Sequence, residues 1–154
     1  TIPLTTKRVL RFRAIPIFDT DVMRMFTHAY GRFMELGRWH LIYGSEFRRV
    51  ALRNKWLPVT ANEMLTYRRP LKAFQAFELS TALVFWDERR FYLEHVISSD
   101  NQIYATSIVG GVMRGPKGIL HPNDVFREVG IREMPGELSD DTSRRVKLLR
   151  DLQT

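Results

Sequence analysis

The fold is decided by the stretch AFELSTALVFWDERRFYLEHVISS, residues 76–99. In its first half, large apolar residues such as Phe77 and Leu79 alternate with smaller or polar ones. This period of two is typical of a β-strand with one face on a core. A polar turn at Asp87–Arg89 separates it from a second apolar run, Phe91–Ile97. The stretch therefore predicts a β-hairpin.

The flanking segments extend this hairpin into an antiparallel sheet with helices. Further strands are expected at Lys7–Ile17, Trp56–Tyr67 and Ile103–Arg114. Helices are expected at Arg24–Tyr43, Glu46–Asn54, Pro122–Val129 and Ser139–Leu152. Pro and Gly gather between Gly115 and Gly136, which indicates loops and short turns. This order predicts one α+β domain over residues 1–154, with a core at about 7–129 and a C-terminal extension whose helix covers about 139–152.

The first helix is the longest element that the sequence predicts. Phe26, Tyr30 and Phe33 recur at helical spacing on an apolar face too wide for a simple stripe, which indicates burial on more than one side. Gly37 lowers helix propensity, so we interpret it as a point of close approach to the sheet. Gly44 is a plausible C-terminal stop.

Composition excludes several classes of protein. The chain has 154 residues, of which 44% are hydrophobic, and this is enough to fill a core. It has no Cys, which excludes disulfides, thiolate zinc sites and a Cys nucleophile and suits a reducing compartment. No apolar run approaches the ~18 residues of a membrane span. The first residue is Thr, and the N-terminal segment shows no signal-peptide pattern. We expect a location in the cytoplasm or, after loss of a targeting segment, in the mitochondrial matrix.

The charge is strongly basic. The formal net charge is +7 and the pI is about 10.1, which favours anionic partners. Arginine pairs such as Arg48-Arg49 and Arg144-Arg145 are spread along the chain and form no block. This pattern favours a solvated surface over a nucleic-acid-binding stripe.

Two stretches resemble a known family. The first runs from Tyr67-Arg68-Arg69-Pro70-Leu71 through Phe77-Glu78-Leu79 to Trp86–Glu94, and the second joins Phe18–Asp21 to Met34–Arg38. Together they resemble the thioesterase superfamily member six type of the 4-hydroxybenzoyl-CoA thioesterase superfamily. The resemblance implies a hotdog fold, a long helix wrapped by an antiparallel sheet. It also implies dimers that pair through edge strands, sites at the dimer interface, and acyl-CoA as the substrate.

The resemblance also implies site residues near the start of the long helix. Asp21 matches the family's second acid, which attacks the thioester or directs water, although an Asp there also suits a helix N-cap. The family then has a His, two Asn and a Tyr. The stretch from Val22 to Tyr30 is one residue shorter and lacks both Asn. Tyr30 matches if this deletion is allowed, and His28 either replaces a lost polar group or is an ordinary packed or solvent-facing residue.

Further candidates lie along the helix and after the last strand. Helix amides around Phe26–His28 would polarise the carbonyl, and the acyl chain would follow the helix past residues such as Phe33. Glu35 is either a catalytic helix carboxylate or the partner of Arg38 in an i,i+3 ion pair, which we favour.

The cations Arg114 and Lys117 would hold the CoA phosphates, unless they form an ordinary basic turn. His40, His95 and His121 lack metal-ligand spacing, so we expect neither a metal nor a cofactor.

Three functions remain open from the sequence. The first is an acyl-CoA thioesterase acting as a homodimer. The second is a catalytically degenerate hotdog subunit of a larger assembly, with a mitochondrial complex as one candidate, because the stretch after Asp21 is altered and the charge is high. The third, direct RNA binding, rests on charge alone.

Overall fold

A computed structural model describes residues 3–15, 25 and 27–152. In chain order, its elements are β1 (Arg8–Arg13), α1 (Thr27–Tyr43), α2 (Phe47–Asn54), β2 (Leu57–Tyr67), β3 (Ala76–Trp86), β4 (Phe91–Ser99), β5 (Gln102–Gly115), β6 (Gly118–Leu120), α3 (Pro122–Val129) and α4 (Asp140–Asp151). The expected order of one strand, a long helix and then a series of strands is confirmed.

The strands form one antiparallel sheet of six, in the order β1-β3-β4-β5-β2, with β6 paired to β5. The predicted hairpins join β3 to β4 and β4 to β5. In the first turn, the Asp87 carboxylate accepts hydrogen bonds of 2.8 Å from the backbone N–H groups of Arg89 and Arg90. In the second turn, Asp100 and Asn101 both have positive φ, which suits residues that tolerate the left-handed region. Hydrogen bonds and backbone conformation within the two turns therefore favour this series of antiparallel hairpins.

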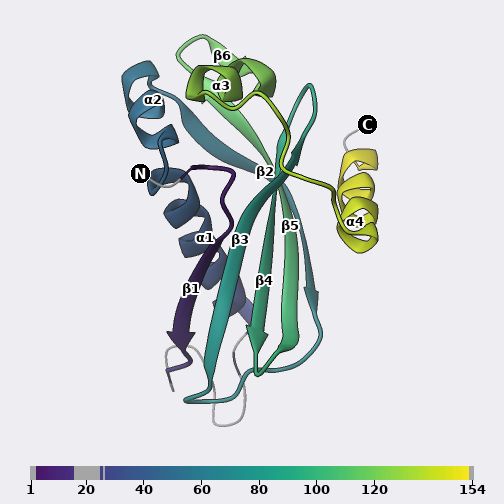
Figure 1. Cartoon of the computed structure of the whole chain (residues 1–154). Coiled ribbons are helices and arrows are strands. Elements are labelled where there is room, and N and C mark those ends of the chain that lie inside the picture. The colour runs from purple at the N-terminus through teal and green to yellow at the C-terminus, as the bar shows by residue number, and fades with distance from the viewer. Residues whose placement is uncertain (1–2, 16–24, 26, 153–154) are drawn as a thin grey trace.

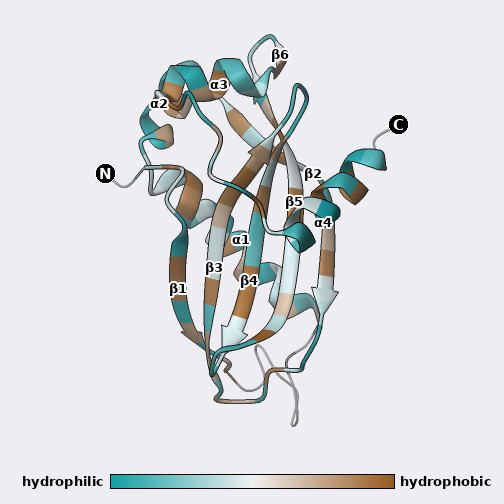
Figure 2. Ribbon diagram, turned by 45° about the vertical axis from the view of Figure 1, so that its right-hand side comes forward, coloured by the Kyte–Doolittle hydropathy of each residue, from teal (hydrophilic) through white to brown (hydrophobic). Residues whose placement is uncertain are grey.

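Helices cover the two faces of this sheet (Figure 1). Along β4, Phe91 and Leu93 belong to an apolar cluster with residues of α1, whereas Tyr92, which points the other way, packs with residues of α4. Figure 2 shows the corresponding alternation of hydrophobic and hydrophilic residues along β1 and β3. We call the face under α1 the inner face and the face under α4 the outer face.

The close approach predicted at Gly37 is confirmed. A β-carbon there would overlap the Thr81 hydroxyl oxygen of β3 and lie 2.9 Å from a methyl carbon of Leu79. Helix α1 therefore rests directly on β3 at this point, and only glycine permits that contact. The predicted stop is also observed, because α1 ends at Tyr43 and the Gly44 N–H bonds the His40 carbonyl oxygen at 3.0 Å.

The C-terminal helix packs on the body of the protein. The Ser139 hydroxyl caps it by accepting a hydrogen bond of 3.2 Å from the Thr142 N–H. Val146 and Leu149 are buried against Tyr92 and Ile108 of the outer face. The helix predicted at Ser139–Leu152 is confirmed, with observed bounds of Asp140–Asp151.

One expected boundary is not tested, and one segment differs from prediction. The expected start of α1 at Arg24 lies outside the described residues, and the helix is described from Thr27. The segment after Gly115, expected to be loop, contains the strand β6, which begins at Gly118 with a φ of 125°. A strand of three residues is too short to show periodicity, so sequence patterns miss it.

The contact at Gly37 predicts opposite effects of two Gly→Ala substitutions in α1. Gly37→Ala should lower the free energy of unfolding, because overpacking costs about 1–3 kcal/mol and exceeds the helix-propensity gain of about 1 kcal/mol. Gly31→Ala is the matched control, because a β-carbon there meets nothing within 4 Å, and it should stabilise. Urea denaturation should separate the two variants by about 2 kcal/mol. Equal stabilities would show that the close approach carries no energetic constraint.

Candidate functional site

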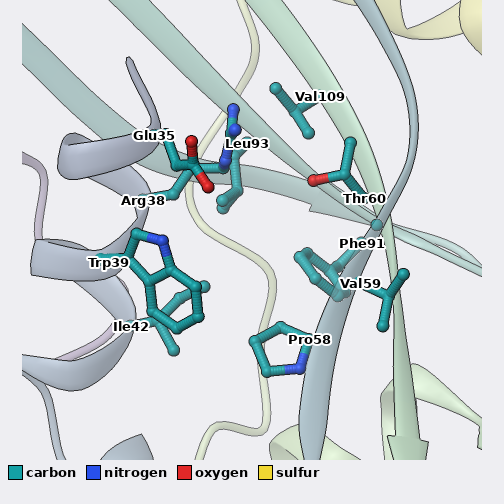
Figure 3. A pocket seen from close by; sticks show the side chains of 11 residues that line it. Glu35, Arg38, Trp39, Ile42, Pro58, Val59, Thr60, Phe91, Leu93 and Val109 are labelled. Atoms are coloured by element: carbon teal, nitrogen blue, oxygen red, sulfur yellow. The ribbon is translucent and has the colours of Figure 1, made fainter. Parts of the chain in front are cut away.

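A cavity of about 270 Å³ lies between α1 and the edge strand β2 (Figure 3). Its walls are Glu35, Arg38, Trp39 and Ile42 of α1 and Pro58, Val59 and Thr60 of β2, and its floor is Phe91, Leu93, Val109 and Gly111 of β4 and β5. We call this cavity the α1–β2 pocket. The helix residues follow i, i+3, i+4, i+7 spacing, so one stripe of α1 forms the whole wall.

The floor of the pocket depends on Gly111. A β-carbon at this position would lie 2.5–3.1 Å from ring carbons of Phe91. The missing side chain lets the Phe91 ring lie against the strand, where a larger residue would push it into the pocket. The resulting surface is mainly apolar and suits the body of an acyl group.

Two charged side chains of α1 stand at one end of the pocket (Figure 3). The Glu35 carboxylate is exposed to solvent. Arg38 Nη1 lies 3.7 Å from Glu63 Oε1 of β2, and the ion pair that we favoured between Arg38 and Glu35 is not formed. That prediction is wrong because Arg38 turns inward towards the sheet, which leaves Glu35 beside the pocket opening.

A cluster of polar side chains lies on the inner face next to the pocket. It consists of Thr81 of β3, His95 of β4, Ser107 of β5, Glu63 of β2 and Arg38 above them, and we call it the polar cluster. Thr81, His95 and Ser107 are directly opposed across neighbouring strands. Thr81 Oγ1 lies 3.0 Å from His95 Nδ1, and the Ser107 hydroxyl donates to Glu63 Oε1 at 2.9 Å.

The His95 ring is completely buried. Burial, followed by the positive charge of Arg38, lowers the pKa of His95 to about 3, so the imidazole is neutral at physiological pH. Its Nε2 atom and Arg38 Nη1 are buried and have no hydrogen-bond partner among the described residues. Sequence reasoning treated His95 only as a poor metal ligand. The missed signal was that Thr81, His95 and Ser107 each occupy a position that faces the core in the alternating pattern of its strand.

Tyr30 lies at the far end of α1 and is buried. Its hydroxyl accepts a hydrogen bond from the Leu71 N–H at 3.1 Å and donates to the Arg69 carbonyl oxygen at 3.4 Å. Burial raises the pKa of Tyr30, so the phenol stays protonated. This geometry ties α1 to the segment before β3, and the catalytic role expected for Tyr30 stays a prediction.

The structure gives a different outcome for each of the other residues predicted along the first helix. Asp21 lies outside the described residues. His28 is exposed, in agreement with its solvent-facing interpretation. Phe33 does not line the α1–β2 pocket but packs in an aromatic cluster with Phe12 and Phe77, at ring-centroid distances of 4.9 and 5.0 Å. The pocket lies on the other flank of α1 from the one that Phe33 suggested.

Arg114 and Lys117 lie at the opposite end of the sheet from Tyr30. Arg114 pairs with Leu57 at the start of β2, and Lys117 is in the turn to β6, whereas the Tyr30 ring packs on Tyr67 at the end of β2, 5.2 Å away. The eleven residues of β2 span roughly 35 Å. A single chain therefore does not bring Arg114 and Lys117 together with Tyr30.

Some site classes find no support in the described part of the chain. No group of three or more His, Asp or Glu side chains there is arranged to hold a metal ion. Over the same residues, no helix is long and apolar enough to cross a membrane.

A profile of the thioesterase-like superfamily matches residues 15–118, about two-thirds of the chain. The chain belongs to the thioesterase-like superfamily. The match covers α1, the α1–β2 pocket and all members of the polar cluster. A search of proteins with curated functions gives no significant match.

Solved structures similar to this superfamily member share its fold. YbaW, a probable thioesterase from Escherichia coli, aligns with a TM-score of 0.73 and 18% identity, over 83% of this chain and 98% of that one. The hypothetical protein SAV2348 from Staphylococcus aureus, solved with CoA, aligns with a TM-score of 0.69 and 12% identity, over 90% and 92% of the two chains. A DHNA-CoA thioesterase from Staphylococcus aureus aligns with a TM-score of 0.65 and 10% identity, over 96% and 95%. The predicted hotdog fold is thereby confirmed.

The buried imidazole predicts a pH effect on stability. In the unfolded chain His95 takes up a proton below its ordinary pKa of 6.5, but in the folded chain it does so only near pH 3. Its contribution is therefore fully present above pH 6.5 and is lost as the pH falls towards 3. Between pH 6.5 and 4.5 the loss is about 2–3 kcal/mol.

Urea denaturation at these two pH values should show a smaller pH-dependent loss for His95→Gln than for the wild type. His28→Gln replaces an exposed histidine and should keep the wild-type loss. Parallel pH profiles for all three proteins would contradict the assignment of this effect to His95.

Proposed function

We propose that this protein binds acyl-CoA thioesters in the α1–β2 pocket and hydrolyses them as a homodimer. The observation that carries the proposal is an apolar pocket with an exposed carboxylate, Glu35, at its opening, in a chain of the thioesterase-like superfamily. The CoA bound to one structural neighbour and the CoA thioester in the name of another support the same ligand class.

Hydrolysis needs an attacking oxygen and donors for the developing oxyanion. A carboxylate takes a proton from water, the water oxygen adds to the thioester carbonyl, and the CoA thiolate leaves and is protonated. We assign the carboxylate to Asp21, with Glu35 as the second candidate. Backbone N–H groups at the start of α1 would stabilise the oxyanion.

A homodimer through β2 would complete the site. This strand is an edge of the sheet, and an unpaired edge is a template for another strand. Exposed apolar side chains also gather on β2 and on the neighbouring flank of α1. They are Leu57 and Tyr67 of β2 and Leu36 and Trp39 of α1.

Antiparallel pairing of two β2 strands about a two-fold axis puts the Leu57 end of one chain beside the Tyr67 end of its partner. Arg114 and Lys117 of one chain would then approach the start of the partner's helix. This arrangement would reunite the phosphate-binding and catalytic residues that a single chain keeps apart.

A non-catalytic subunit is the second candidate. It is favoured by the Tyr30 hydroxyl, which hydrogen-bonds to backbone groups of Arg69 and Leu71, and by the shortened stretch after Asp21. Such a subunit would bind acyl-CoA without turnover in a larger assembly, with a mitochondrial complex as one candidate.

Catalysis is tested with a panel of acyl-CoA thioesters of increasing chain length, by following thiol release. Asp21→Asn should lower kcat/KM at least about 100-fold, because a general base contributes about 10²–10⁴. Glu35→Gln is the competing variant, and a larger loss there moves the role to Glu35. Asp100→Asn, in the exposed β4–β5 turn, is the matched control and should keep wild-type activity. Binding without any turnover would favour the non-catalytic subunit, and the absence of both would refute the proposed function.

The dimer is tested by analytical ultracentrifugation. Leu57→Glu introduces a charge at a β2 position that is 52% exposed and should weaken self-association at least about tenfold, since buried charge opposes edge pairing. Leu52→Glu makes the same change on α2, at a position 64% exposed, and should leave association unchanged. A wild-type protein that is monomeric at micromolar concentration would rule out this interface.

A further inference from the structure

The polar cluster interrupts an otherwise apolar inner face. The floor of the α1–β2 pocket is formed by Phe91, Leu93, Val109 and Gly111. Two residues beyond Leu93 and Val109, the next inward-facing positions on these strands are His95 and Ser107. Glu63 is opposed to Val109, so it stands beside the pocket floor. The polar cluster therefore begins where the apolar pocket ends.

Packing alone gives no reason for this cluster. Thr81, His95 and Ser107 are fully buried. Buried polar groups without hydrogen bonds destabilise a fold, whereas apolar residues of similar size would not. Yet His95 Nε2 and Arg38 Nη1 have no hydrogen-bond partner among the described residues. The carboxylate of Glu63 is 3.7 Å from Arg38 Nη1, too far for a hydrogen bond, so Arg38 Nη1 and His95 Nε2 can each still form a hydrogen bond with a further polar group.

The charges select the kind of group that fits. Arg38 supplies an N–H donor, which calls for an oxygen acceptor. Glu63 lies 3.7 Å from that donor and would repel a second carboxylate. A hydroxyl group suits both neighbours, because its oxygen accepts from Arg38 while its O–H donates to Glu63 or to the neutral His95 ring. A plain alkyl chain would leave these atoms unpaired.

We propose that Arg38 and the polar cluster are specificity-determining and select a short acyl group that carries a hydroxyl, which binds beside Arg38 at the polar end of the α1–β2 pocket. The inference rests on the proposed function, because it concerns the acyl group bound at the same site. The pocket volume of about 270 Å³ is at the low end of the range for ligand sites, roughly 300 Å³, which favours a short acyl group. The hydroxyl would replace a missing hydrogen-bond partner within the cluster.

The test uses non-hydrolysable thioether analogues of butyryl-CoA, 3-hydroxybutyryl-CoA, 4-hydroxybutyryl-CoA and succinyl-CoA, with affinities measured by isothermal titration calorimetry. Binding is measured directly, so the outcome does not depend on turnover. At least one hydroxyl analogue should bind about tenfold more tightly than the butyryl analogue, since a hydrogen bond to a charged group is worth a factor of this order. The succinyl analogue should gain no such advantage.

Variants assign the preference to the polar cluster. Arg38→Met and Ser107→Ala should each reduce the hydroxyl preference, measured within each variant as the ratio of the hydroxyl-analogue affinity to the butyryl-analogue affinity, Arg38→Met to within about twofold. Arg32→Met removes an exposed arginine from the same helix and should keep the preference. Ser107→Ala removes one oxygen atom, so it keeps the test valid if Arg38→Met does not fold. Thermal melts establish folding.

The outcomes separate this inference from the proposed function. Binding of all analogues with equal affinity would overturn the hydroxyl preference alone, and would mean that ordered water satisfies the cluster. Tighter binding of the succinyl analogue would overturn it in favour of a carboxylate. Failure of every analogue to bind would refute the proposed function and the inference with it. A preference unchanged in both Arg38→Met and Ser107→Ala would show that other residues select the ligand.

Discussion

The contact between Gly37 of α1 and Thr81 of β3 sets the position of everything on the inner face. At this point the helix has no side chain, and its backbone rests directly on the side chains of Thr81 and Leu79. On one flank of α1, Phe33 packs with Phe12 and Phe77. On the other flank, Arg38 and Trp39 face β2 across the α1–β2 pocket.

The same contact controls the electrostatics of the polar cluster. Because α1 lies so close to the sheet, Arg38 is brought near His95 in a region that water does not reach, and both burial and that charge lower the pKa of His95. The imidazole is thereby kept neutral and serves as a fixed hydrogen-bonding group, without the charge change usual for histidine near pH 6.5. Arg38 is paired with Glu63 on the edge strand, at 3.7 Å. The pocket is thus apolar along its floor and strongly polar at one end.

The outer face of the sheet is occupied by the chain itself. Helix α4 buries Tyr92 and Ile108 under Val146 and Leu149. It is fixed there by polar contacts, with the Thr142 hydroxyl donating to Glu94 Oε2 and the Arg150 side chain 3.0 Å from Asp87. Apolar surface then remains at the β2 edge and on the neighbouring flank of α1, which are the surfaces that the proposed dimer uses. The C-terminal helix therefore covers the outer face, whereas the proposed dimer uses the β2 edge and the neighbouring flank of α1.

The sequence by itself determined the elements whose signals are local. The period of two in residues 76–99 and the turn chemistry of Asp87 specified the meander, and the apolar spacing and Gly37 specified a helix pressed onto a sheet. The sequence placed the candidate residues Tyr30, Arg114 and Lys117 on their elements but not in one site, because their separation depends on strand register. Only the tertiary structure decided that Arg38 turns away from Glu35 to Glu63, and that three polar residues from separate strands meet under α1. Such contacts join residues dozens of positions apart, and no local pattern encodes which distant side chain will supply a partner.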